Sequence, residues 1–208
     1  VHVTTLLIAD DQTLIRTALA TMLGLEADLD VVGQAGTCGE AVRVAGETQP
    51  DVLLLDVQMP DDGLGVEDGI EAIPAILAAS PDTRVVVVTT FGRPGYLRRA
   101  MERGAVGFLV KDTPVDRLVE SIRRVAQGLR AVDPELAAAS LSIGASPLTE
   151  KEGLVLAASA GGANTAQVAQ SVHLSEGTVR NYLSSAIGKL GARNRAEALR
   201  SATDNGWL

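Results

Sequence analysis

Carboxylates end two apolar, strand-like segments of the chain. Asp10 and Asp11 follow the run 3–9, and Asp56 ends the run 52–56. If the fold brings them together, three carboxylates repel one another, and a hard divalent cation such as Mg²⁺, which prefers oxygen ligands, offsets that repulsion. A carboxylate in such a place can act as a nucleophile and accept a phosphoryl group as an acyl phosphate. These acids therefore predict phosphoryl-transfer chemistry, with Asp56 as the acceptor.

Two further side chains suit the same chemistry. Thr89 ends the apolar run 84–89, and Lys111 follows the run 106–110. A phosphoryl group gains from a hydroxyl donor and an ammonium group beside it. Each residue alone has an ordinary explanation, since an acid after a strand is usually a helix cap and a loop lysine is usually a solvated charge. Their combination at four strand ends, in the right order, is what favours a site.

The elements that must position these side chains alternate along the chain. Strands are expected at 3–9, 29–35, 52–56, 84–89 and 106–110, and helices at 13–24, 39–48, 70–79, 95–103 and 115–128. Five strands alternating with five helices predict an α/β fold with a doubly wound, five-stranded parallel sheet of the flavodoxin-like type. Ligands of such sheets bind at the carboxyl ends of the strands, where all five candidate residues fall.

The rest of the chain lacks a strand pattern. Helices are expected at 149–160, 165–171, 176–190 and 195–205, with the turn 172–174 between the second and third. This spacing predicts an all-α, four-helix domain that contains a helix-turn-helix. Its core would hold Val168, Leu174, Val179, Leu183 and Ile187, which leaves an outward face of Arg180, Asn181, Ser184 and Ser185. Polar side chains of this kind can read base edges. We expect domains at 1–128 and 147–208, joined by a linker at 129–146.

Charge and composition agree with this division. The 208 residues carry a net charge of −8, but residues 147–208 hold six Lys or Arg and five Asp or Glu, a net of +1, so the remainder carries −9. The last part is therefore free to approach an anionic partner. Cys38 is the only cysteine, which excludes an intrachain disulfide and a structural zinc site. We see no signal peptide and no apolar run long enough to span a bilayer, so we expect a cytoplasmic protein with no membrane partner.

Four segments together resemble the receiver domain of two-component response regulators. They are residues 8–11, 54–60, 87–90 and 107–112, and the resemblance covers nearly all of residues 3–128. It implies that Asp56 is the phosphoacceptor and that Mg²⁺ is held by Asp11, Asp56 and the backbone carbonyl of Gln58, with Asp10 acting through water. Lys111 and Thr89 would assist the transfer, and Thr89 and Phe108 would form a switch pair. Such a receiver takes its phosphoryl group from a sensor histidine kinase and catalyses only its own transfer and hydrolysis, so it is not an enzyme acting on an outside substrate.

Another four segments, residues 148–152, 163–169, 174–182 and 189–198, resemble the LuxR-type helix-turn-helix. The resemblance places Arg180, Asn181 and Ser184 at base contacts and Thr178, Tyr182 and Lys189 at phosphate contacts. The family more often has Lys and His at positions 180 and 182, which bears on sequence preference. The whole chain resembles the NarL/LuxR (FixJ) group. Residues 89–96, 177–182 and 206–207 look most like DesR-like regulators, which sense membrane fluidity and control a fatty-acid desaturase.

The resemblance implies a DNA-binding transcriptional response regulator. Phosphorylation of Asp56 would favour a homodimer that grips two half-sites of double-stranded promoter DNA about one helical turn apart. Helices 13–24 and 115–128 would pair the receivers, and helix 195–205 would pair the DNA-binding domains.

One loop departs from the family, and two other classes of protein stay open. The loop 61–68 is about five residues longer than the family's turn and is rich in acids, which is either a tolerated insertion or a means of altering metal affinity, phosphate lifetime or partner choice. A phosphatase of the aspartyl-phosphate type would also place an acid after a strand, but it usually has a second acid where this chain has Gln58. A phosphorylation-independent regulator with an inactive receiver would not need the intact acidic set.

Overall fold

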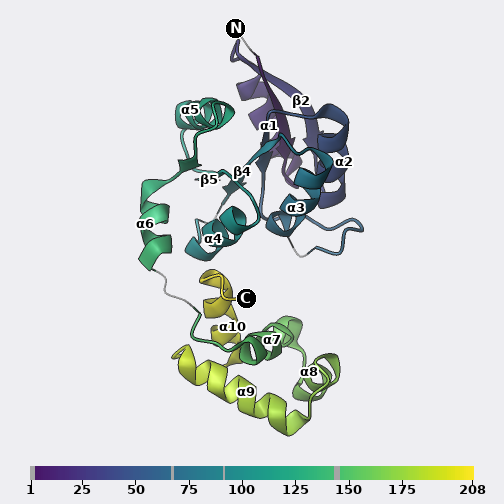
Figure 1. Ribbon diagram of the computed structural model, residues 1–208, viewed down its shortest axis with the longest axis vertical. Coiled ribbons are helices and arrows are strands. Elements are labelled where there is room, and N and C mark those ends of the chain that lie inside the picture. Colours follow the sequence, from purple (N-terminus) through teal and green to yellow (C-terminus); the bar gives the residue numbers. More distant parts are fainter. Residues whose placement is uncertain (1–2, 67, 91, 143–145) are drawn as a thin grey trace. The chain divides into compact units, whose positions relative to one another are not determined.

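The computed structural model describes residues 3–66, 68–90, 92–142 and 146–208. They form two compact units. The first comprises residues up to 92 together with 97–137, and the second comprises 138–208 together with 93–96. Figure 1 shows a mixed α/β unit in the first half of the chain and helices in the second. The expected domain boundaries at 128 and 147 stay predictions.

The first unit is built on a parallel sheet. Its strands, in the spatial order β2-β1-β3-β4-β5-β6, are β2 (Leu29–Ala35), β1 (Thr4–Ala9), β3 (Val52–Leu55), β4 (Arg84–Thr89), β5 (Gly107–Val110) and β6 (Ala131–Val132). All of the pairings are parallel. The predicted doubly wound parallel sheet is confirmed, with a sixth strand of two residues beyond the five expected. That strand lies inside the segment predicted to be a linker.

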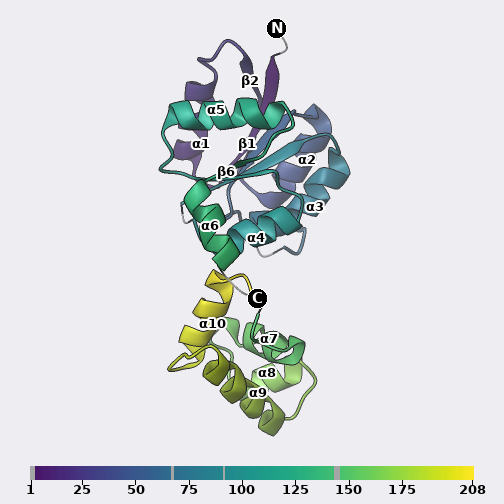
Figure 2. The ribbon, with the colours of Figure 1, turned by 60° about the vertical axis from the view of Figure 1, so that its left-hand side comes forward.

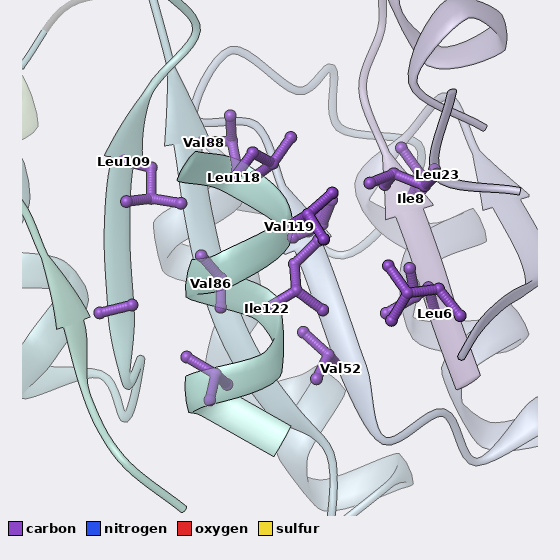
Figure 3. Packing of buried hydrophobic residues seen from close by; sticks show 14 residues of the cluster. Leu6, Ile8, Leu23, Val52, Val86, Val88, Leu109, Leu118, Val119 and Ile122 are labelled. Carbon is purple, nitrogen blue, oxygen red and sulfur yellow. The ribbon is translucent and has the colours of Figure 1, made fainter. Parts of the chain in front are cut away.

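Helices cover both faces of this sheet (Figure 2). They are α1 (Thr13–Leu23), α2 (Cys38–Thr48), α3 (Gly69–Ala79), α4 (Pro94–Glu102) and α5 (Val115–Ala126), and α6 (Pro134–Ser142) comes after β6. Parallel strands buried on both faces need apolar residues at every position, and all four residues of β3 are buried. Figure 3 shows one face of the core, where Leu118, Val119 and Ile122 of α5 pack against side chains of the strands.

Local sequence signals fix several helix starts. The side chain of Thr37 accepts a hydrogen bond from the backbone N–H of Glu40 at the start of α2. Asp68 caps α3 in the same way through the N–H of Glu71. Such caps satisfy backbone donors that the first turn of a helix leaves without a partner. They place the helices directly after the loops at the carboxyl edge of the sheet, where the candidate acids lie.

The second unit is helical, as predicted. Its helices are α7 (Glu150–Ala157), the short 3-10 turn η1 (Ala160–Gly162), α8 (Thr165–Ser171), α9 (Glu176–Lys189) and α10 (Arg195–Asp204). Val168, Val179 and Leu183 are buried in its core, and Leu174 and Ile187 pack against them, as expected. Thr149 and Glu152 form a capping box at the start of α7. A search of the described residues found no helix that is long and apolar enough to cross a membrane.

Candidate functional site

Three carboxylates meet at the carboxyl edge of the sheet. Asp10 and Asp11 come directly after β1, and Asp56 comes directly after β3, which is paired with β1 so that Ala9 lies level with Leu55. One carboxylate oxygen from each acid lies within 4.8 Å of the other two. Asp10 and Asp56 are buried, and Asp11 is exposed at the rim. The register of two neighbouring strands thus brings together acids that are 45 residues apart in the sequence.

Lys111 lies against two of these acids. Its Nζ is 2.6 Å from Asp10 Oδ2 and 2.9 Å from Asp56 Oδ2. The backbone N–H of Lys111 donates to the carbonyl of Thr89 at 2.8 Å, which holds the start of the loop beside the end of β4. Burial disfavours the charged form of Lys111, but its hydrogen bonds to Asp10 and Asp56 outweigh that effect and raise its pKa. The ammonium group is therefore fixed as a cation inside the acidic site.

The two carboxylate oxygens of Asp56 differ in their surroundings. Burial raises the pKa of its carboxyl group, and the hydrogen bond and charge of Lys111 oppose that rise. Among the described residues, nothing hydrogen-bonds to the buried Oδ1 atom of Asp56. A buried carboxylate oxygen without a partner is costly, and it suits a cation or an incoming group that the protein alone does not supply. The orphaned oxygen and the three converging carboxylates fit a hard divalent cation.

The remaining predicted receiver residues lie around this site. Thr89, at the end of β4, is buried, and so is Phe108 in β5. In the β4–β5 register, Val87 pairs with Phe108 and Thr89 pairs with Val110. Thr89 lies two residues beyond Val87, the partner of Phe108. Because side chains alternate along a strand, Thr89 and Phe108 therefore face the same side of the sheet. Gln58 is exposed two residues beyond Asp56, and its role as a metal ligand through the backbone carbonyl stays a prediction.

Arg16 is a residue near the site that sequence reasoning missed. From α1, its guanidinium group donates to the backbone carbonyl of Asp10. The N–H of Gln12 donates to Asp10 Oδ1 at 2.9 Å. Together these contacts fix the loop that carries the acid pair. A single arginine six residues beyond Asp10 belongs to none of the motifs, so the sequence held no signal for this contact.

The acids of the long loop have local partners. Asp62 accepts hydrogen bonds from the hydroxyl of Thr37 and the backbone N–H of Gly39 at the start of α2, and these bonds lower its pKa. Asp61 accepts from the N–H groups of Leu64 and Gly65 within the loop itself. These acids serve backbone donors of the loop and of α2. Glu67, another acid of the loop, lies outside the described residues.

Asp68, at the end of the loop, has a partner on another helix. Its side chain caps α3 and also forms an ion pair with Arg99 of α4, at 3.1 Å. Arg99 also forms an ion pair with Glu71 of α3, at 2.8 Å. The side chains of all three residues are largely shielded from solvent. Within the described residues, the one group of acids arranged to hold a metal ion is Asp10, Asp11 and Asp56, so the loop contributes no described acid to it.

The predicted base-contacting residues share an exposed face of α9. Arg180, Asn181 and Ser184 are all exposed. Ser175 caps this helix by accepting a hydrogen bond from the backbone N–H of Thr178. Arg180 lies 3.7 Å from Glu176 one turn earlier, but both side chains are more than half exposed, so this ion pair holds Arg180 weakly. The helix thus presents polar donors and acceptors to solvent along one side.

The predicted phosphate contacts are placed differently from one another. Thr178 is half-buried and its hydroxyl lies 2.8 Å from that of Ser175, and Tyr182 packs against the core of the second unit. Lys189 forms an ion pair with the buried carboxylate of Glu152, at 2.7 Å. Lys189 therefore ties α9 to α7 in addition to any contact that it makes with DNA.

Ser185 extends this connection between the helices. It is exposed on α9, as the sequence pattern predicts, and its hydroxyl also donates to Glu152 Oε1, at 2.6 Å. Glu152 is the capping-box residue of α7, so a single carboxylate serves the start of α7 and the end of α9.

Known protein families match both units. The response regulator receiver domain matches residues 6–123, and the DNA-binding domain of the bacterial regulatory proteins of the luxR family matches residues 146–202. Together with the fold and the acidic site, these matches define a two-domain response regulator. The chain belongs to the response regulators that carry a LuxR-type DNA-binding domain. Members of this family are transcription factors rather than enzymes that act on an outside substrate.

Full-length relatives agree with this assignment. The transcriptional regulatory protein DesR of Bacillus subtilis is 39% identical over 97% of this chain and 97% of its own length. The DNA-binding transcriptional activator DevR/DosR of Mycobacterium tuberculosis is 34% identical over 95% and 93%. A solved structure of the RcsB response regulator of Salmonella typhimurium shares the fold, with a TM-score of 0.69 and 23% identity over 96% of this chain and 99% of that one. The predicted similarity to DesR is confirmed, while the membrane-fluidity signal and the desaturase stay predictions.

Proposed function

We propose that this response regulator is switched by phosphorylation of Asp56. The observation that carries the proposal is the position of Asp56, buried at the carboxyl edge of the sheet. Lys111 lies on one of its oxygens, and no described residue hydrogen-bonds to the other. The free Oδ1 atom attacks the phosphorus atom of a phosphohistidine in a sensor histidine kinase. The bond from phosphorus to the imidazole nitrogen breaks, and its electron pair returns to the imidazole. The product is an acyl phosphate on Asp56.

The acidic cluster suits Mg²⁺ as the cofactor of this reaction. Asp11, Asp56 and the backbone carbonyl of Gln58 would hold the ion, and Asp10 would act through water. These donors are all oxygen atoms, which are the ligands that Mg²⁺ prefers. The ion would supply positive charge that offsets the negative charge of the carboxylates and of the phosphoryl oxygens.

The protein's own residues bind the phosphoryl group and respond to it. Lys111 keeps its charge inside the site and donates to the phosphoryl oxygens in place of Asp56 Oδ2, which it holds before the reaction. The hydroxyl of Thr89 moves toward the phosphoryl group. Phe108 lies on the neighbouring strand β5 and faces the same side of the sheet as Thr89. Its ring then changes its packing in response to the movement of Thr89. A local change in charge is thus passed to the helices beyond β4 and β5.

The output of this switch is binding to double-stranded promoter DNA. Arg180, Asn181 and Ser184 of α9 read base edges, while Thr178, Tyr182 and Lys189 contact phosphates. Phosphorylation favours a homodimer, and a symmetric dimer binds two half-sites about one helical turn apart. The receiver at 1–128 and the DNA-binding domain at 147–208 act through the linker 129–146. A bacterial promoter lies in the cytoplasm, which is where we place the protein, with no membrane partner.

The test compares the chain with Asp56→Asn in the presence of Mg²⁺ and acetyl phosphate. Mass spectrometry of the intact protein should show one added phosphoryl group on the parent and none on the variant. Light scattering and DNA binding should show a dimer with tighter binding for the phosphorylated parent alone. If Asp56→Asn dimerises and binds DNA under the phosphodonor as the parent does, the switch is independent of Asp56, and the alternative of a regulator with an inactive receiver takes its place.

A further inference from the structure

A second polar cavity lies in the first unit, away from the carboxylates. Its volume is about 210 Å³, and it is formed by α5, the end of β5 and the segment around β6. Figure 2 shows α5 and β6 in the same part of the unit, and the two elements are in contact. The floor is apolar, with Leu109, Ala131 and Val132, and the hydroxyl residues Thr113 and Ser121 are half-buried at its wall. None of the lining residues belongs to the site around Asp56.

Three arginines line this cavity. Arg117 and Arg124 lie two turns apart on one side of α5, and Arg130 immediately precedes β6. Among the residues that the structure describes, none of the three guanidinium groups has an ion-pair or hydrogen-bond partner. Arg123 on the same helix, by contrast, is held by Glu26 and Asp28. In a half of the chain that carries the protein's negative charge, three unpaired cations around one cavity are an unusual concentration of positive charge.

The two acids of the lining compensate this charge only in part. Asp133 Oδ1 is used by the backbone N–H groups of Glu135 and Leu136, at 2.8 and 3.1 Å, where it starts α6. Glu120 is exposed and lies on α5 between two of the arginines in sequence, but it forms no ion pair with any described residue. Three guanidinium groups against these two carboxylates leave a net positive lining. Planar guanidinium groups bind phosphate and carboxylate oxygens through paired hydrogen bonds.

We propose that this cavity binds a small anion that carries two linked phosphate groups. Its volume of about 210 Å³ is below the range of sites for drug-sized ligands, which favours a small anion. The three arginines supply donors from α5 and from the chain beside β6, so the bound anion bridges these two elements. β6 is a two-residue strand at the edge of the sheet, paired to β5 alone, and it gains most from such a bridge. The site gives the receiver a second input that is separate from Asp56.

Isothermal titration calorimetry of the full chain with inorganic pyrophosphate tests the proposal, in EDTA and without Mg²⁺ so that the acidic site is not involved. We expect saturable binding of one pyrophosphate per chain. Arg117→Gln, Arg124→Gln and Arg130→Gln should each weaken the binding by about tenfold or more, because each removes a charge-assisted donor. Arg43→Gln, which removes an exposed arginine paired with Glu47 on α2, is the matched control and should bind as the parent does.

Two further measurements distinguish a nucleotide from an inorganic ligand, and the arginine cavity from the site around Asp56. Binding of ADP in the same arginine-dependent way supports a nucleotide source, and preference for pyrophosphate supports an inorganic one. Asp56→Asn should bind pyrophosphate as tightly as the parent. Circular dichroism checks that each variant is folded, and Arg→Lys at the same positions, which keeps the charge, should weaken binding less than Arg→Gln. Absence of saturable binding, or equal binding by the parent and the three Arg→Gln variants, would overturn the proposal.

Discussion

Lys111 Nζ lies 2.9 Å from Asp56 Oδ2, although 55 residues separate the two in the sequence. The contact joins the ends of β5 and β3, with β4 between them in the sheet. It fixes one oxygen of Asp56, while the other has no hydrogen-bond partner in the part of the chain that the structure describes. A carboxylate held in this way presents one defined oxygen atom, beside a fixed cation, to any group that enters the site.

Replacement of Lys111 by Met should slow phosphorylation of Asp56 without unfolding the receiver. Met keeps much of the apolar stem but removes the donor, and loss of one such donor costs on the order of a hundredfold in rate. The rate of labelling by acetyl phosphate, followed by intact-protein mass spectrometry, measures the effect. Lys151→Met, an exposed lysine of α7 in the other unit, is the control. Labelling of Lys111→Met at the parent rate would show that the lysine has no part in the transfer.

Asp11→Asn should weaken Mg²⁺ binding. The variant removes a negative oxygen donor from the exposed rim of the acidic cluster but keeps its shape. The loss should exceed the roughly tenfold that even an outer-shell partner contributes to metal affinity. Titration calorimetry is the suitable measurement, because the unit that holds this site contains no tryptophan: the only one, Trp207, belongs to the second unit. Asp30→Asn, at an exposed position in β2, should leave the affinity unchanged.

The strands and the acidic site could be predicted because their signals are local. Uninterrupted apolar runs mark strands buried on both faces, and a parallel sheet must gather the residues at the carboxyl ends of its strands along one edge. Strand β6 could not be found in this way. Ala131 and Val132 are too short a run to show a period, and they form a strand only because Gly107 and Phe108 of β5 are there to pair with them.

Contacts between side chains that are far apart in the sequence could not be predicted for the same reason. Lys189 suggests a phosphate contact by its place in the motif, and nothing near it indicates a pair with Glu152, 37 residues earlier. The capping box of Glu152, by contrast, has a local signal in the sequence, because Thr149 is three residues away. Propensity and motif thus identify what a residue does for its own helix, while its second partner depends on how helices pack.

Asp62→Ala should destabilise the receiver and leave the lifetime of phosphorylated Asp56 unchanged. Asp62 accepts hydrogen bonds from Thr37 and Gly39 and so satisfies donors at the start of α2, a structural task away from the acidic cluster. We expect a lower Tm in thermal unfolding, with the rate of phosphate release equal to that of the parent. Asp82→Ala, in an exposed turn, should change neither. A changed phosphate lifetime would instead tie the long loop to the chemistry at Asp56.

Arg180→Ala should reduce the affinity for the promoter site by about tenfold to a hundredfold, because a bidentate contact to a base edge is lost. The side chain is 65% exposed and contributes little to folding, so the Tm should stay that of the parent. Fluorescence anisotropy with the promoter site and with a scrambled duplex separates base reading from phosphate contact. Lys151→Ala, which removes an exposed cation of α7, is the control. Equal losses on both duplexes would mean that Arg180 contacts the backbone and not a base.

Glu152→Gln should change how the second unit responds to acid. Hydrogen bonds from Lys189, then from Ser185 and from the backbone N–H of Thr149, lower the pKa of Glu152 from 4.5 to about 2 in the folded state. A carboxyl group with a lowered folded pKa binds fewer protons in the folded than in the unfolded state. Its contribution to stability is complete above pH 4.5 and disappears as the pH falls toward 2.

The fluorescence of Trp207, which packs against the core of the second unit, measures this unfolding directly. The parent should be more stable than Glu152→Gln at pH 6, and the difference should shrink steadily between pH 4.5 and 2, because the charged acceptor of Lys189 is lost from the parent in that range. Glu150→Gln, an exposed acid two residues earlier in α7, should behave as the parent does throughout. A constant difference between the parent and Glu152→Gln across this range would contradict the ion pair with Lys189 as the source of the stability.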